Sequence, residues 1–214
     1  MITIDAFESE IKKGSISSGY VFCGLDEELI KENVNLLIKK VVNKDLMDLN
    51  LVKLDGLNAT FDDIKNACET VTFFGGKRVV LVYRANFLKD KTDKEGSKTY
   101  SELSKYVKDL PPDTVLIMYY LFNDKRDTPK KNKKLTTLDK VLNVVHCDKL
   151  KKDKYYKKVE ELFKERGKPI GKIQVKYFSE RVQNNFDIIK REIDKLVSYT
   201  EGREITKEDI DKLL

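Results

Sequence analysis

The chain has 214 residues, of which 40% are hydrophobic and 36% charged, and its 42 basic and 36 acidic side chains leave a net charge of +6. A disordered chain would carry fewer aliphatic residues and a larger net charge per residue, so the composition indicates one large globular domain, or one domain with a small satellite. No apolar run approaches the roughly 20 residues that cross a bilayer, and residues 1–12 lack the features of a secretory signal. We therefore expect a cytoplasmic protein without a membrane segment.

Residues 1–147 alternate short apolar β-rich runs with helical patterns, which predicts a mostly parallel α/β sheet covered by helices. Five runs are predicted to be strands: 20–23, 49–54, 78–83, 114–119 and 143–147. The helix after the second strand takes Thr60 as its N-cap, includes Val71 in its apolar face and ends at Gly75-Gly76. A loop is expected over 90–99, before a helix that begins near Tyr100.

Residues 148–214 show only helical periodicity and predict a small all-helical domain. Three helices are expected around 156–163, 173–182 and 188–197. A fourth begins at Thr206, with Asp209 as the partner in its capping box.

The connection after the first predicted strand resembles a phosphate-binding loop in spacing only. Gly19 and Gly24 have the G-x-x-x-x-G spacing, but Leu25 and Asp26 stand where a lysine and a hydroxyl residue should follow. Asp26 and Glu27 would repel phosphate groups. The sequence therefore predicts a degenerate phosphate loop that neither binds nor hydrolyses ATP.

Metal and nucleophile chemistry also lack the residues they need. The strand over 78–83 continues into Arg84 with no pair of acids that could hold magnesium. The three cysteines at positions 23, 68 and 147 are widely spaced and are predicted to be core thiols. The single histidine, His146, is adjacent to Cys147 on a strand, so the two side chains point to opposite faces and form no catalytic pair. We expect no metal and no cofactor.

The positive charge is concentrated in two segments. Residues 124–134 contain six basic and two acidic side chains, and residues 149–158 contain six basic and one acidic, so the rest of the chain is slightly acidic. Such segments attract phosphate backbones or acidic partners, although lysine-rich surfaces are also often merely solvated. The candidate contacts to DNA or a partner are Lys125, Arg126, Lys130, Lys131, Lys151 and Lys152.

Several segments occur in a characteristic order along essentially the whole chain. They are residues 20–27 (YVFCGLDE), 72–82 (TFFGGKRVVLV), 85–88 (ANFL), 124–126 (DKR), 185–196 and 205–210 (ITKEDI). In this order they resemble the delta subunit of the bacterial DNA polymerase III clamp loader.

This resemblance implies an AAA+ fold whose nucleotide site, at Gly24, Leu25, Asp26 and Glu27, has decayed, followed by a helical lid domain. A C-terminal collar domain would come next in the family, and the chain is expected to stop where it would begin. The resemblance implies no intrinsic enzymatic activity. It links the chain to a DNA-directed DNA polymerase, a nucleotidyltransferase, only as part of the holoenzyme.

The resemblance also implies a role in DNA replication, in which the protein binds the ring-shaped sliding clamp and holds it open. The clamp-binding tip maps onto Phe73 and Phe74, with Thr72 beside them. From pattern alone, the favoured role of these phenylalanines is to close the core beneath the sheet, and the alternative is an apolar tip that protrudes before Gly75-Gly76; the resemblance favours the tip. The implied partners are the sliding clamp, the ATPase subunits and delta-prime, and primed DNA within the assembled loader.

Three alternatives compete with this interpretation. An active ATPase lacks support because the phosphate-binding lysine and the metal-binding acids are missing. A stand-alone basic DNA-binding protein would bind DNA with a steep salt dependence as the isolated chain. A sister subunit of the loader would carry a zinc module or a Ser-Arg-Cys run, and the sequence contains neither.

Overall fold

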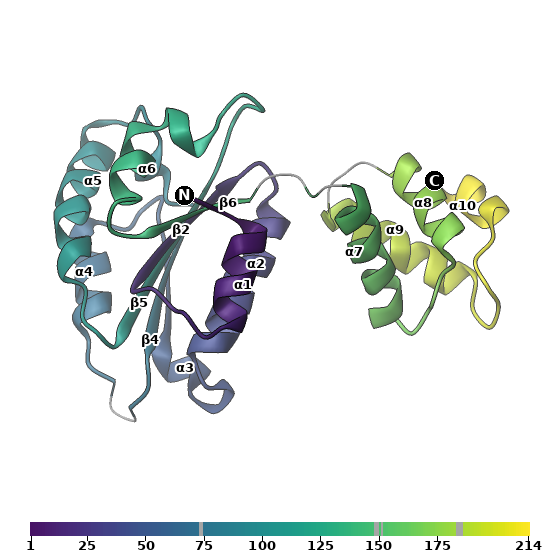
Figure 1. Cartoon of the computed structure of the whole chain (residues 1–214), viewed down its shortest axis with the longest axis horizontal. Coiled ribbons are helices and arrows are strands. Elements are labelled where there is room, and N and C mark those ends of the chain that lie inside the picture. Colours follow the sequence, from purple (N-terminus) through teal and green to yellow (C-terminus); the bar gives the residue numbers. More distant parts are fainter. Residues whose placement is uncertain (73–74, 148–149, 151, 183–185) are drawn as a thin grey trace. The chain divides into compact units, whose positions relative to one another are not determined.

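The protein forms two compact units, Met1–Asp148 and Lys149–Leu214 (Figure 1). The structure is a computed structural model that describes residues 1–72, 75–147, 150, 152–182 and 186–214. Each unit has a hydrophobic core of its own.

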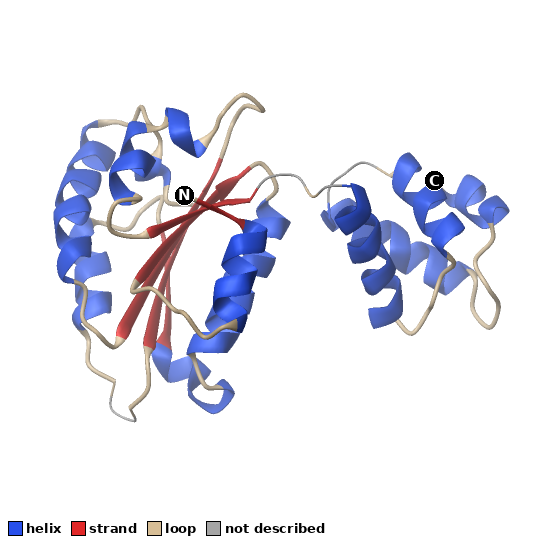
Figure 2. Ribbon diagram, viewed as in Figure 1, coloured by secondary structure: helices blue, strands red, loops and turns tan. Residues whose placement is uncertain are grey.

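The first unit is built on a six-stranded sheet in which the strand order is β1-β6-β2-β5-β4-β3 and every pairing is parallel (Figure 2). Its strands are β1 (Ile2–Thr3), β2 (Gly19–Gly24), β3 (Leu51–Asp55), β4 (Arg78–Tyr83), β5 (Thr114–Leu121) and β6 (Asn143–Cys147). The prediction of an α/β fold with a mostly parallel sheet is confirmed.

Helices cover both faces of this sheet, with α1 and α2 on one face and α4, α5 and α6 on the other (Figure 1). The α-helices are α1 (Ile4–Lys12), α2 (Glu27–Val41), α3 (Met47–Asn50), α4 (Phe61–Glu69), α5 (Lys94–Tyr106) and α6 (Lys133–Leu138). Short 3-10 turns are η1 (Lys44–Leu46), η2 (Asn86–Leu88), η3 (Val107–Asp109) and η4 (Pro129–Lys131).

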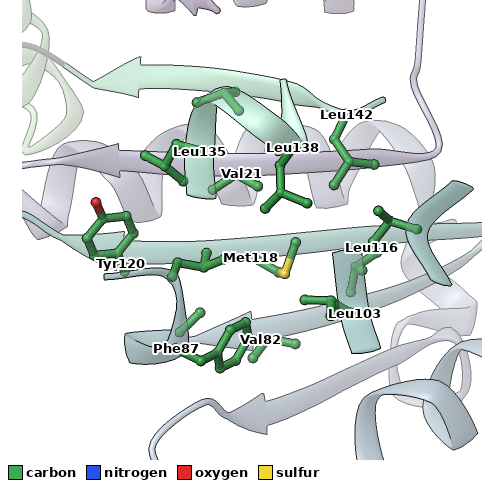
Figure 3. Packing of buried hydrophobic residues seen from close by; sticks show 14 of the residues in the cluster. Val21, Val82, Phe87, Leu103, Leu116, Met118, Tyr120, Leu135, Leu138 and Leu142 are labelled. Atoms are coloured by element: carbon green, nitrogen blue, oxygen red, sulfur yellow. The ribbon is translucent and has the colours of Figure 1, made fainter. Parts of the chain in front are cut away.

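The central strands are apolar on both faces because helices bury both faces of the sheet. All six residues of β2 are buried, and β5 is buried from Thr114 to Tyr120. Figure 3 shows Val21, Met118 and Val82 from neighbouring strands packing with leucines of α5 and α6. The three cysteines are free and buried, and burial raises the pKa of Cys23 and of Cys68 to about 12, which is the behaviour of core thiols.

The second unit is helical and consists of α7 (Lys152–Glu165), α8 (Lys172–Arg181), α9 (Phe186–Tyr199) and α10 (Lys207–Leu213). Its core includes an edge-to-face pair of Phe163 and Phe178 with ring centroids 5.3 Å apart. Thr206 and Asp209 form the capping box expected at the start of α10.

Two local predictions were wrong, and one pair of elements was not predicted. The N-terminal elements β1 and α1 were not predicted. Strand β1 has only two residues and is defined by the pairing of Ile2 with Val145 of β6. Helix α5 begins at Lys94 inside the expected loop, because the Asp93 carboxylate caps it through the Gly96 N–H at 2.8 Å. Helix α4 ends at Glu69, before Val71, and the extended residue Thr70 closes it with a hydroxyl bond to the Asn66 carbonyl.

Val71 is 76% exposed and therefore does not belong to the apolar face of α4. Among the described helices, none is long and apolar enough to cross a membrane.

Candidate functional site

The connection between β2 and α2 lies where a phosphate-binding loop would be. Only Leu25 and Asp26 separate the end of the strand at Gly24 from the first helical residue, Glu27. The Asp26 carboxylate caps α2 by accepting the N–H of Leu29 at 3.1 Å. An anion bound at a helix N-terminus uses these same amide groups. The helix therefore already has a carboxylate at the position where a phosphate would bind.

Gly24 is explained by packing within the sheet. It pairs with Leu121 on one side and Cys147 on the other, and its carbonyl accepts the N–H of Phe122 at 2.8 Å. A Cβ atom at this position would collide with the carbonyl oxygen of Cys147. A glycine is thus required here whether or not phosphate is bound.

Charged groups at the carboxyl ends of β3 and β4 are paired with each other. Arg84 has a left-handed backbone (φ 53°), and its guanidinium binds both carboxylate oxygens of Asp55, with Nε at 3.2 Å from Oδ1. At this left-handed turn, the backbone after β3 lies close to the backbone after β4. Gly56 donates its N–H to the Tyr83 carbonyl at 2.7 Å, and a Cβ atom on Gly56 would press on Ala85. A guanidinium therefore neutralises the acid at this edge of the sheet.

Tyr119 connects β5 to the same region. Its hydroxyl donates to Glu27 Oε1 at 3.1 Å, and burial, followed by the nearby Glu27 charge, raises the pKa of the phenol, so it stays protonated as a donor. In the described part of the chain, no group of three or more His, Cys, Asp or Glu side chains is arranged to hold a metal ion. The side chains at this edge bind one another, and they do not fit a magnesium nucleotide.

The segment between α4 and β4, residues 70–77, carries the predicted clamp-binding residues. Phe73 and Phe74 lie outside the described residues. Thr72 is half-buried, and its hydroxyl donates to the Gly76 carbonyl at 3.4 Å. Gly75 and Gly76 both have left-handed backbones (φ 73° and 80°). Exposed Val71 precedes this turn, so the described ends of the segment lie at the surface.

Asn50 anchors this segment from a distant part of the chain. It is the last residue of α3, is 4% exposed, and donates its Nδ2–H to the Gly75 carbonyl at 3.3 Å. On the other side, the Thr114 hydroxyl at the start of β5 donates to the Cys68 carbonyl in α4 at 2.8 Å. Buried side chains therefore hold the chain on both sides of residues 73–74. Sequence reasoning missed Asn50, because a single asparagine carries no pattern.

The first basic segment lies on the loop after β5 and includes η4. Lys125, Arg126, Lys130 and Lys131 are all exposed. Arg126 pairs with Asp124 through two bonds of 3.0 and 2.8 Å, which lowers the pKa of that carboxyl, and Lys131 Nζ donates to the Arg126 carbonyl at 3.1 Å. The loop thus has internal order while it presents its cations to solvent.

Lys134 of the same segment has a structural role. Its ammonium donates to the Phe87 carbonyl at 2.8 Å and to the Thr92 hydroxyl at 2.9 Å, and lies 5.1 Å from the centre of the Tyr100 ring. Burial lowers its pKa. In the second basic segment, Lys152 begins α7 and is exposed, whereas Lys151 lies outside the described residues.

Two further lysines, which sequence reasoning missed, belong to the same edge of the sheet. Lys89 and Lys91 line a cavity of about 450 Å³ beside Gly56 and Asn86 and a second of about 380 Å³ that also includes Lys131. Lys89 directly precedes the predicted loop 90–99, and Lys91 lies within it. No sequence pattern links them to Lys131, because about 40 residues separate them from it.

A parallel sheet in this order, with helices on both faces and a helical unit after it, is an AAA+-like architecture. Domain III of the replication initiation protein DnaA from Thermotoga maritima is similar, with a TM-score of 0.64 at 15% identity over 99% of this chain and 89% of that one. The RuvB Holliday junction branch migration motor of the same organism is similar as well, with a TM-score of 0.60 at 11% identity over 97% of this chain and 64% of that one. These two likenesses concern the fold alone.

The family is given by sequence. The model of the DNA polymerase III delta subunit matches residues 20–148, and the chain belongs to that family. It is 27% identical to DNA polymerase III subunit delta of Bacillus subtilis over its whole length, and it spans 61% of the length of that relative. The structure of the Bacillus subtilis DNA clamp loader delta protein is similar with a TM-score of 0.66 at 26% identity, over 99% of this chain and 62% of that one.

Proposed function

We propose that the protein is the clamp-opening subunit of a DNA polymerase III clamp loader and acts in DNA replication in the cytoplasm without an activity of its own. Membership of the delta subunit family supports this assignment. We assign residues 1–147 to the AAA+ domain and residues 148–214 to the lid. The chain spans 61% of the length of the Bacillus subtilis relative.

In this proposal, ATP is bound and hydrolysed by other subunits. The carboxylate of Asp26 at the N-terminus of α2 and the Arg84–Asp55 pair at the adjacent strand ends support it. A phosphate at the first position would meet a fixed negative charge, and a magnesium ion at the second would meet a guanidinium. Gly24, Leu25, Asp26 and Glu27 are therefore a phosphate loop in position only.

The observation that carries the proposal is the anchored segment 70–77. It joins α4 to β4, its described ends lie at the surface, it has two left-handed glycines, and its sequence contains two adjacent phenylalanines next to Thr72. Burying two phenylalanine side chains in a partner is worth roughly 3–6 kcal/mol before association costs. That is the energy of an interface hot spot, and we assign Phe73 and Phe74 to the clamp.

The test is the double substitution Phe73→Ala and Phe74→Ala, measured as retention of the sliding clamp of the same organism on the surface-immobilised 214-residue chain. We expect clamp affinity to fall about 100-fold or more, because roughly 3 kcal/mol corresponds to about two decades in Kd. Far-UV circular dichroism should stay unchanged, since the segment lies outside helix α4 and strand β4.

The matched control is Leu36→Ala with Leu57→Ala, which removes two exposed apolar side chains elsewhere on the same unit. The control should retain the clamp at the level of the original chain. Unchanged clamp retention by the phenylalanine variant would contradict the proposal.

The remaining partners follow from the same assignment. We propose contacts with the ATPase subunits and delta-prime, and with primed DNA inside the assembled loader. The exposed cations Lys125, Arg126, Lys130 and Lys131, and Lys151 and Lys152 of the second basic segment, are the candidates for these contacts. A stand-alone DNA-binding protein would instead hold DNA tightly at physiological salt as the isolated chain.

A further inference from the structure

A polar cavity of about 380 Å³ lies at the carboxyl end of β5. Its lining comes from the turn after η2, from residues 120–123 at the end of β5, and from the loop around η4. The residues that matter for its chemistry are Lys89, Asp90, Lys91, Tyr120, Asp127 and Lys131. Ligands of open parallel sheets commonly bind outside the carboxyl ends of the strands.

The lining of this cavity carries more positive than negative side chains. Lys89 and Lys91 form no ion pair or side-chain hydrogen bond with any residue that the structure describes. Lys131 Nζ is bonded to a neutral group, the carbonyl of Arg126. Three lysines from two segments therefore line one cavity, together with the two carboxylates of Asp90 and Asp127.

The two acids of the lining are already occupied by backbone donors. Asp90 accepts the N–H of Lys133 at 3.2 Å, and Asp127 accepts the N–H of Asp124 at 3.1 Å. These bonds hold the loop around η4 against the turn after η2. The acids thus shape the cavity but keep their charge, so three lysines against two carboxylates leave its lining with a formal charge of +1, which favours an anion.

A neutral donor lies in the same cavity. Tyr120 is 4% exposed, and Asn132 donates its Nδ2–H to the Tyr120 hydroxyl at 2.9 Å. Burial raises the pKa of this phenol, so it keeps its proton. Within the described residues, that proton has no acceptor. Buried hydroxyl donors are normally satisfied, and an anionic oxygen in the cavity would satisfy this one.

We propose that this cavity is a phosphate-binding site in which Lys89, Lys91 and Lys131 hold a phosphodiester of the DNA backbone. The assignment of DNA as the source of the phosphate rests on the proposed function. The site adds Lys89 and Lys91 to the exposed cations of the loop after β5, and so joins two segments into one surface for DNA.

The test compares Lys89→Gln with Lys91→Gln against a control with the same loss of charge, Lys39→Gln with Lys40→Gln, two exposed lysines in the last turn of α2. Affinity of the 214-residue chain for primed DNA is measured by fluorescence anisotropy from about 50 mM salt upward. We expect the cavity variant to lose at least 10-fold in affinity at the lowest salt. Its slope of log K against log salt should fall by about 1.5, for two lost phosphate contacts.

The control should lose less than about 3-fold with its slope unchanged, because only phosphate contacts change the slope. Tyr120→Phe removes the hydroxyl donor and leaves the charges of the cavity unchanged. We expect this variant to lose about 3-fold in DNA affinity and to keep the original slope of log K against log salt. Equal behaviour of the cavity variant and the control would overturn the proposal.

Pyrophosphate, added alone and followed by calorimetry, distinguishes a free phosphate from DNA. Pyrophosphate binding that the cavity variant abolishes, together with unaltered DNA affinity, would overturn the assignment to DNA. The cavity variant should also retain the sliding clamp normally. If the Phe73→Ala and Phe74→Ala variant retained the clamp, that result would count against the proposed function. The comparison of DNA affinity between the cavity variant and its control would remain valid.

Discussion

Asn132 joins three parts of the first unit, and its replacement should be among the costly single changes there. Its Oδ1 caps α6 by accepting the N–H groups of Lys134 at 2.9 Å and Leu135 at 3.2 Å. Its Nδ2 donates to the Leu88 carbonyl and the Tyr120 hydroxyl, both at 2.9 Å. The residue is 6% exposed, so water cannot replace these bonds.

The magnitude follows from these four bonds. Loss of an N-cap costs about 1 kcal/mol, and leaving buried polar groups without a partner costs about 1–3 kcal/mol. Asn132→Ala should therefore lower the free energy of unfolding of the first unit by about 2–4 kcal/mol.

The assay is amide hydrogen exchange in urea, followed in peptides from β2 and β5. These strands report the free energy of the first unit, whereas the helical unit has its own core and can unfold separately. The control is Asn43→Ala, which removes an exposed cap that bonds the Asp45 N–H at 3.2 Å, and should cost less than about 1 kcal/mol. A loss for Asn132→Ala no larger than that of the control would refute the reasoning.

Two further predictions concern the clamp and the nucleotide. Asn50→Ala removes the donor to the Gly75 carbonyl and should weaken clamp binding about 5-fold, since a hydrogen bond contributes about 1 kcal/mol. Surface-immobilised chain and clamp measure this change, with Asn43→Ala as the control, and undiminished affinity would show that the anchor does not position the segment. A fluorescent ATP analogue should bind the chain with a Kd no tighter than about 1 mM, because Asp26 already caps α2. Tight binding in a titration of analogue fluorescence would contradict a degenerate phosphate loop.

The predicted strands follow from the composition of each segment. The centres of runs such as 114–119 are apolar at every position from Val115 to Met118, and the structure buries them on both faces in the parallel sheet. The capping residues Thr60 and Thr206 were also predictable, because a cap and its helix are separated by only three residues.

Element boundaries were harder where a polar sequence meets a tertiary contact. The start of α5 is packed through Thr99 and Leu103, although residues 94–98 are polar and typical of a loop. Strand β1 has two residues, and only its pairing with β6 makes it a strand. Neither feature leaves a periodic pattern in the sequence.

The sequence by itself determined the two-part organisation of the fold, the absence of a phosphate-binding lysine after Gly24, and the presence of a Phe-Phe-Gly-Gly segment. These properties depend on residues within a few positions of one another. Only the tertiary structure brought Asn50 to Gly75, Arg84 to Asp55, and Lys89 and Lys91 to Lys131. These partners are 25 to 42 residues apart, and strand order, which no local interaction encodes, decides which of them meet.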